Sequence, residues 1–192
     1  MSPKVMSNVI DAIVSFWFGA SDSPDFGKDR AAWFTKDAKF DADIRNRFGR
    51  VIDAAGAGQL DMMAESAEGA VALVVVLDQF PRNVFRDDAR SFENDPHALK
   101  IAKAALDQGF DQQVIPVMRK FLYLPFEHSE NLDDQERALE LFAVLGEQDL
   151  EWAQKHHQII VRFGRFPHRN AVLGRISTPE EKAFLMEPGS SF

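Results

Sequence analysis

Apolar residues recur at helical spacing along nearly the whole chain. Phe40, Ile44, Phe48 and Ile52 repeat every four residues, and the apolar residues of 9–17 also fall on one helical face. Residues three or four positions apart share a face of an α-helix, whereas a half-buried strand alternates apolar and polar side chains. No segment shows a clear alternation, so the pattern predicts an all-α protein with more than half of its residues in helices.

Glycine, proline and capping residues divide this pattern into separate helices. Glycine is favoured just after a helix, and Ser, Thr or Asp is favoured just before one. These signals predict helices over 9–17, after Asp37 to Gly56, from Ser66 to Leu77, from Asp95 to Gly109, from Val117 to about Leu124, from Asp133 to Gly146, from about Gln148 to Phe163, and a short last helix behind a capping box of Thr178 and Glu181.

The most apolar segment is the uninterrupted run from Ala70 to Leu77. A helix that is apolar on every side lies in the centre of a protein, so we expect Leu73 to be fully covered. A buried strand is the alternative, because Val74, Val75 and Val76 are β-branched. The helix is the preferred interpretation, since nothing nearby offers strand partners.

Length, cysteine content and net charge exclude several classes of protein. A chain of 192 residues fits one all-helical domain over residues 1–192. The absence of cysteine excludes disulfides, a thiolate nucleophile and a zinc finger. A net charge of −8 argues against broad binding to nucleic acid or anionic membranes. Met1 to Asn8 lacks the apolar stretch of a signal peptide, and no apolar run approaches the roughly 20 residues of a membrane span. We therefore expect a soluble cytoplasmic protein.

The predicted helices pair as hairpins with short turns. One hairpin would occupy about 95–130 and another about 132–164. A unit of about 34 residues is the tetratricopeptide period, although the consensus Trp, Gly, Tyr and Pro positions are not visible. The expected architecture is therefore a stack of helical hairpins, tetratricopeptide-like, with an irregular helical bundle as the alternative.

Three polar segments interrupt the helical pattern: Asp78–Asn83, Leu124–Glu130 and Phe163–Asn170. The first and third share Phe-Pro followed by Arg-Asn. Each follows a predicted helix end, where proline stops the helix and asparagine tolerates left-handed turn geometry. An arginine held beside such a turn is pre-organised for bidentate contact with a carboxylate or phosphate.

These segments resemble an uncharacterised bacterial family known as domain of unknown function 924. The resemblance extends over essentially the whole chain. It implies an all-helical, tetratricopeptide-like fold and implies no activity. The matching residues are Trp17-Phe18, Trp33-Phe34, Leu77–Asn83, Leu124–Glu130, Gly164–Asn170 and Pro188–Phe192.

We expect the three polar segments to meet, with Arg82, Glu127 and Arg169 in one cluster, because a buried charge is costly unless it is paired. A mainly structural polar network and a ligand pocket are both compatible with this expectation. The candidate site residues are Arg82, Arg165 and Arg169 as cations, Asp78, Glu127 and Glu130 as anions, His128 and His168 as proton carriers, and Gln79, Asn83 and Asn170 as ligand-orienting amides.

Three kinds of function fit these residues. The first is binding of a small anionic ligand or an acidic peptide end in a groove. The second is an enzyme with Glu127 or His128 as general base and with Arg82 and Arg169 as clamps; His168 is a further catalytic candidate. The third is a protein-interaction scaffold.

No cofactor or metal is expected. Adjacent His156 and His157 would point about 100° apart on a helix, and the ligand spacings of helical metal sites are missing. The ligand's identity, any reaction and the oligomeric state are left open.

Overall fold

The computed structural model describes residues 2–191, and the all-α class is confirmed. Helical residues make up 69% of the described chain, and no strand occurs between Ser2 and Ser191. The last residue of the Pro188–Phe192 motif lies outside the described residues.

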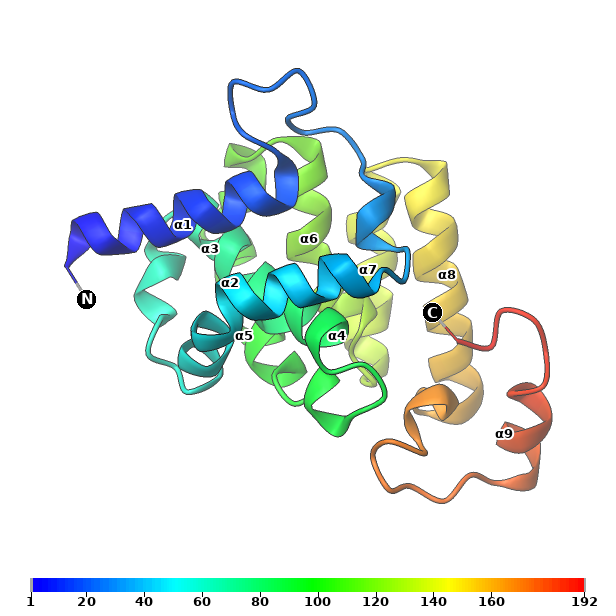
Figure 1. The fold of residues 1–192 in the computed structure, drawn as a ribbon. Helices are drawn as coiled ribbons and strands as arrows, with labels where there is room; N and C mark the ends of the chain where they lie inside the picture. The colour runs from blue at the N-terminus through cyan, green and yellow to red at the C-terminus, as the bar shows by residue number, and fades with distance from the viewer. Residues whose placement is uncertain (1, 192) are drawn as a thin grey trace. The chain divides into compact units, whose positions relative to one another are not determined.

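The chain folds into helices joined by short turns and by longer loops, such as those over 19–37 and 170–178 (Figure 1). No helix of the described chain is both long and apolar enough to cross a membrane. The α-helices are α1 (Pro3–Phe18), α2 (Ala38–Gly56), α3 (Ala67–Val74), α4 (Phe80–Val84), α5 (Asp95–Asp107), α6 (Pro116–Glu127), α7 (Leu132–Ala143), α8 (Glu147–Phe163) and α9 (Pro179–Phe184).

Most predicted helix ends depend on local chemistry and are confirmed. Asp37 accepts hydrogen bonds from the first turn of α2, and Ser66 accepts one from Gly69 N at the start of α3. Thr178 and Glu181 form the predicted capping box. The assignment of Asp95 as an N-cap is wrong: Asp95 is the first residue of α5, behind Asn94, and its carboxylate binds Arg82 instead.

The apolar run is helical and central, so the strand alternative is wrong. Every residue from Gly69 to Pro81 is buried, and Leu73 is 0% exposed. The helix continues from α3 through a π-helical turn, Val75–Gln79, into α4. Pro81 has no N–H to donate to this helix, and the π-helical turn ends two residues before it.

The expected helix stop at Pro81 is also wrong. Pro81 lies near the start of α4, so the first polar segment is helical rather than a turn. Pro125, which we expect to end or kink its helix, lies inside α6; the helix does not end there but runs on to Glu127. Proline removes one hydrogen bond from a helix, and at both positions the helix continues with helical backbone geometry on the far side.

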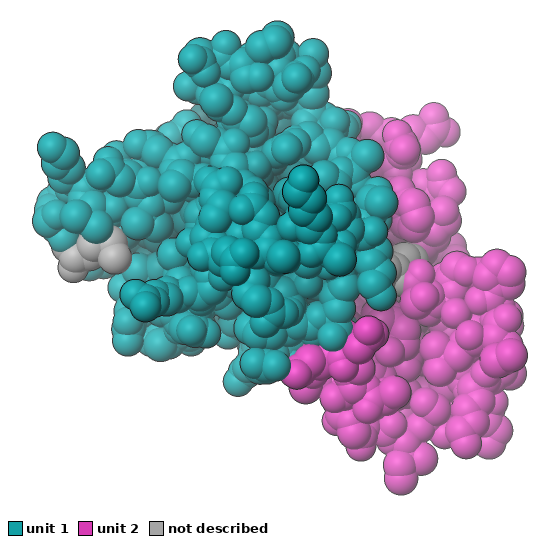
Figure 2. Space-filling view, in the orientation of Figure 1, with its two compact units in different colours: residues 1–86, 90–125 teal, residues 87–89, 126–192 magenta. Residues whose placement is uncertain are grey.

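The chain divides into two compact units, shown in different colours in Figure 2. Unit 1 comprises the chain to Arg86 and Arg90–Pro125; unit 2 comprises Asp87–Ala89 and the chain from Phe126. The boundary falls within α6, between Pro125 and Phe126. The single domain over residues 1–192 stays a prediction.

In unit 1, α3 packs against α1 and α5, and α2 packs against α4. Helices that neighbour each other in sequence are therefore not always partners, and the tetratricopeptide-like regularity is not confirmed. Aromatic rings fill this core: the ring of Trp17 lies 6.0 Å from that of Trp33, 5.5 Å from that of Phe80 and 5.7 Å from that of Phe121.

In unit 2, α7 and α8 pack against each other as the hairpin predicted over 132–164. The hairpin predicted over 95–130 extends over both units and stays a prediction. Buried Ile159, Ile160 and Phe166 form the apolar centre of unit 2, with Phe163 and Phe184 packed against them.

Candidate functional site

Unit 2 gathers a group of titratable side chains that we call the imidazole cluster: Glu127, His128, His156, His168 and Arg169. Glu127 ends α6 and His128 follows it, His156 lies on α8, and the last two come from the 3-10 turn Pro167–Arg169. Glu127, His156 and Arg169 are buried. Residues more than forty positions apart in the sequence therefore supply one polar site.

The carboxylate of Glu127 and the ring of His156 are in direct contact. Glu127 Oε1 lies 3.1 Å from His156 Nδ1, and the Trp152 carbonyl oxygen lies 2.9 Å from the same nitrogen. A ring nitrogen with two oxygens around it must carry a proton. Nδ1–H therefore donates to both, and the neutral ring keeps its acceptor lone pair on Nε2.

His156 is held in its neutral form. Burial lowers the pKa of His156 to about 3, and the hydrogen bond to the Trp152 carbonyl only partly opposes this shift. The charges of His128, Arg169 and His168 lower the pKa further. His156 is therefore neutral at pH 7, although a carboxylate lies within hydrogen-bond distance.

The ring of Phe166 connects the members of this cluster. Its centroid lies 5.6 Å from the His156 ring and 5.6 Å from the His168 ring. The Arg169 guanidinium carbon lies over the same ring, 4.6 Å from its centroid. A cation over an aromatic face is attracted to it, so this fully buried phenylalanine fixes where the charge of Arg169 lies.

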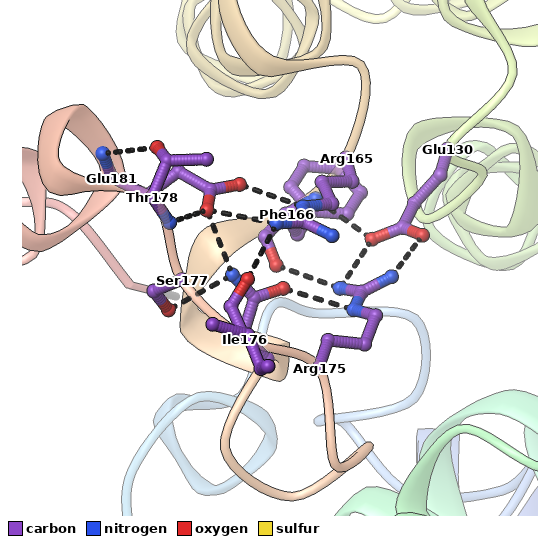
Figure 3. Close-up of polar contacts among 9 residues, drawn as sticks. Glu130, Arg165, Phe166, Arg175, Ile176, Ser177, Thr178 and Glu181 are labelled. Atoms are coloured by element: carbon purple, nitrogen blue, oxygen red, sulfur yellow. Dashed lines mark hydrogen bonds and ion pairs between the residues drawn. The ribbon is translucent and has the colours of Figure 1, made fainter.

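Beside the cluster, Glu130 holds the backbone that carries Phe166 (Figure 3). Arg175 donates two hydrogen bonds to the Glu130 carboxylate, at 2.7 and 2.9 Å, and one to the Phe166 carbonyl at 3.0 Å. Phe166 N–H donates to Glu130 Oε1 at 2.7 Å. Burial would raise the pKa of Glu130, but the hydrogen bonds from Arg175 and Phe166 outweigh it and lower the pKa.

A second network ties the loop before α9 to the third polar segment (Figure 3). The Glu181 carboxylate accepts hydrogen bonds from Arg165 at 2.6 and 2.9 Å, from Thr178 N at 2.7 Å and from Asn170 at 3.3 Å. Chiefly through Arg165, these bonds lower the pKa of Glu181 to about 2. Glu130, Arg165 and Asn170 thus have protein partners, which supports a structural role for these three predicted site residues.

In unit 1, Arg82 lies between two carboxylates. It donates to both oxygens of Asp95, at 2.8 and 2.9 Å, and lies 3.3 Å from Asp78 Oδ1. Gln79 donates to Asp78 at 2.5 Å, and Asn83 donates to Asp41 at 2.8 Å. Arg82 is thus paired with carboxylates four and thirteen residues away in the sequence, neither of which belongs to the other two polar segments.

The sequence predicts Arg82, Glu127 and Arg169 in one cluster. Two of these residues, Glu127 and Arg169, lie beside His156 in unit 2. That Arg82 joins them stays a prediction.

Sequence reasoning missed two residues at these sites. His156 lies on the buried face of α8, with Ala153, Ile159 and Ile160, and a histidine at apolar helical spacing is the signal that would have found it. Arg175 has no such signal, because its partner Glu130 is 45 residues away in the sequence. Within residues 2–191, no three His, Asp or Glu side chains converge in a way that could hold a metal ion.

The profile of a bacterial family of proteins of unknown function, DUF924, matches residues 13–189. The chain belongs to this family. The chain is similar to a solved structure of a protein of unknown function from Agrobacterium tumefaciens, with 43% sequence identity and a TM-score of 0.86. The match covers 94% of this chain and 98% of the Agrobacterium chain. No curated protein matches the chain. In this DUF924 protein, the segments Leu124–Glu130 and Gly164–Asn170 supply every member of the imidazole cluster except His156.

Proposed function

We propose that the imidazole cluster binds a carboxylate or phosphate group, which belongs either to a small anionic ligand or to an acidic peptide end. The observation that carries this proposal is the position of the buried Arg169 guanidinium, which lies over the Phe166 ring beside the rings of His156 and His168. The ring of His128 lies 6.2 Å from that of His156. In a chain with a net charge of −8, a buried guanidinium among imidazole donors is a local place where an oxyanion finds partners.

The donors of the cluster suit an oxyanion. A guanidinium presents its N–H groups in a planar fork that matches carboxylate and phosphate oxygens, and the N–H of an imidazole adds a single donor. Glu127 is the one carboxylate of the cluster, and neighbouring Glu130 is already paired with Arg175. An anionic ligand, including an acidic peptide end, would accept hydrogen bonds from the donors of the cluster.

Calorimetric titration with inorganic phosphate at pH 7 tests this proposal. Arg169→Gln should weaken phosphate binding at least tenfold, about 1.4 kcal/mol. Arg162→Gln is the matched control, because the Arg162 guanidinium also lies 4.6 Å from a phenylalanine centroid, that of Phe163, but on an exposed side chain. Equal phosphate affinity in the two variants would contradict the proposal.

The contact between Glu127 and His156 favours a second function, an enzyme that moves a proton at this site. A carboxylate that holds a histidine in one tautomer is the arrangement by which hydrolases orient a general base. The base would then be His156 rather than His128; with a pKa of about 3 it is unprotonated at pH 7, but a weak base. Hydrolysis of p-nitrophenyl phosphate or acetate that falls in His156→Asn but not in His157→Asn would support this function; equal rates in the two variants would contradict it.

A further inference from the structure

Gln135 of α7 is fully buried and binds the end of another helix. It is 0% exposed. Its Nε2 donates to the Glu127 carbonyl at 2.5 Å and to the Ser129 carbonyl at 2.7 Å, and the Phe126 carbonyl lies 3.5 Å away. A single side-chain amide thus binds the backbone on both sides of His128.

The contacts fix the orientation of this amide. The last carbonyls of a helix have no partner within the helix, and leaving one buried and unpaired costs free energy. Both hydrogens of Nε2 are used, on the last carbonyl of α6 and on the Ser129 carbonyl just beyond it, so a flipped amide would place Oε1 against oxygen atoms. Gln135 Oε1 has no hydrogen-bond partner among the described residues. The donors, and not the acceptor, account for glutamine at this position.

The last turn of α6 depends on hydrogen bonds from outside the helix. Pro125 lies inside its last turn and cannot donate a backbone hydrogen bond. The same turn carries Glu127, whose carboxylate must come within 3.1 Å of His156. A shift of about 1 Å at such a site is enough to disable it.

We infer that Gln135 is the positioning residue of the imidazole cluster: by binding the Glu127 and Ser129 carbonyls, it sets where the Glu127 and His128 side chains lie. This inference rests on the proposed function, because it assigns Gln135 to the anion site. It goes further in naming a residue of α7, outside all three polar segments, as a determinant of anion affinity.

The test replaces Gln135 with Met, which keeps the length of the side chain and removes both donors. Gln108→Met is the matched control, because Gln108 Nε2 also donates to a helix carbonyl, Ala104 O at 3.1 Å, but on an exposed side chain. Two quantities are measured on the folded proteins: the imidazole proton shifts of His128 and His156 without ligand, and the affinity for inorganic phosphate.

Gln135→Met should displace both histidine signals and weaken phosphate binding at least fivefold, whereas Gln108→Met should change neither. Gln135→Asn keeps the amide on a shorter side chain. Its histidine shifts and its phosphate affinity should lie between those of the wild type and those of Gln135→Met, and it replaces the Met variant in the test if that variant does not fold. A lower melting temperature with histidine shifts and phosphate affinity like those of the wild type would mean that Gln135 is a structural cap only, and would overturn the inference.

The two proposals fail differently. If the wild type does not bind phosphate, the proposed function is wrong, and the ligand-free histidine shifts still decide the role of Gln135. If the wild type binds phosphate and Gln135→Met binds it equally well, only the inference is wrong.

Discussion

Glu127 Oε1 lies 3.1 Å from His156 Nδ1, and both side chains are buried. This contact brings the end of α6 against α8 within unit 2. It also places a carboxylate beside His156, whose pKa is lowered by burial and by His128, Arg169 and His168. Glu127 is thus the member of the cluster whose charge opposes an incoming anion.

Removing that charge should strengthen anion binding. In Glu127→Gln the amide keeps the size of the side chain and can still accept the hydrogen bond of His156 Nδ1–H. We expect phosphate affinity to rise several-fold, because one negative charge no longer repels the ligand. Calorimetry measures the change, and unchanged or weaker phosphate binding would show that phosphate does not sit beside Glu127.

Stability should depend on pH through His156. Its pKa is about 3 in the folded protein and near 6.5 when unfolded. The folded state therefore excludes a proton that the unfolded chain takes up, so the stabilisation is full above pH 6.5 and is lost as pH falls toward 3. The free energy of unfolding should fall by up to about 1.4 kcal/mol per pH unit in this window.

Urea unfolding of His156→Asn at several pH values isolates this contribution. The variant should lose stability less steeply than the wild type below pH 6.5. His157→Asn, one residue along α8, should keep the wild-type slope. Parallel curves for the wild type and His156→Asn would mean that His156 can be protonated in the folded protein.

The Glu181 network should hold α9 in place. The pKa of Glu181 is lowered from 4.5 to about 2 in the folded protein. The ionised carboxylate therefore stabilises the fold fully above pH 4.5, and this stabilisation is lost as pH falls toward 2. Glu181→Ala removes the acceptor of Arg165 and the capping-box partner of Thr178. Hydrogen exchange in Pro179–Phe184 should become much faster at pH 7.

Glu180→Ala is the control for this variant, since Glu180 is exposed and pairs only at the surface with Arg162. It should leave exchange in α9 nearly unchanged. The same protection in both variants would show that α9 is held by its apolar contacts instead.

Leu73→Ala should destabilise the protein by about 2–5 kcal/mol, as a large-to-small change in a packed core does. Leu73 is 0% exposed in α3. Leu132→Ala is the control, because Leu132 is 42% exposed and should change stability by less than about 0.5 kcal/mol. Chemical denaturation compares the two, and a midpoint for Leu73→Ala equal to that of the wild type would contradict the buried position.

The helices were predictable where their signals are local. Asp37, Ser66 and Thr178 act within three residues of themselves, and each caps the expected helix. Proline was the misleading signal. Pro81 and Pro125 remove one hydrogen bond each, but helical backbone continues beyond both of them. Propensity is a weak guide where packing decides.

The sites were only partly predictable, because their partners lie far apart in the sequence. From the sequence, Asp95 is predicted to cap a helix, whereas in the structure its carboxylate pairs with Arg82. Arg175 and Gln135 carry no local signal, and their roles follow from Glu130 and from the end of α6. Glu127, His128, His168 and Arg169 stand out because each lies in a polar segment, whereas His156 is hidden in an apolar helical pattern.

The most direct test of the anion site is a phosphate titration followed through the histidine ring protons by NMR at pH 7. The account predicts saturable shifts for His128, His156 and His168. His97, which pairs with Asp61 in unit 1, and His157 should not shift, and Arg169→Gln should abolish the shifts. Histidine signals that do not move, or that all move alike without saturation, would contradict the proposal that this cluster binds an anion.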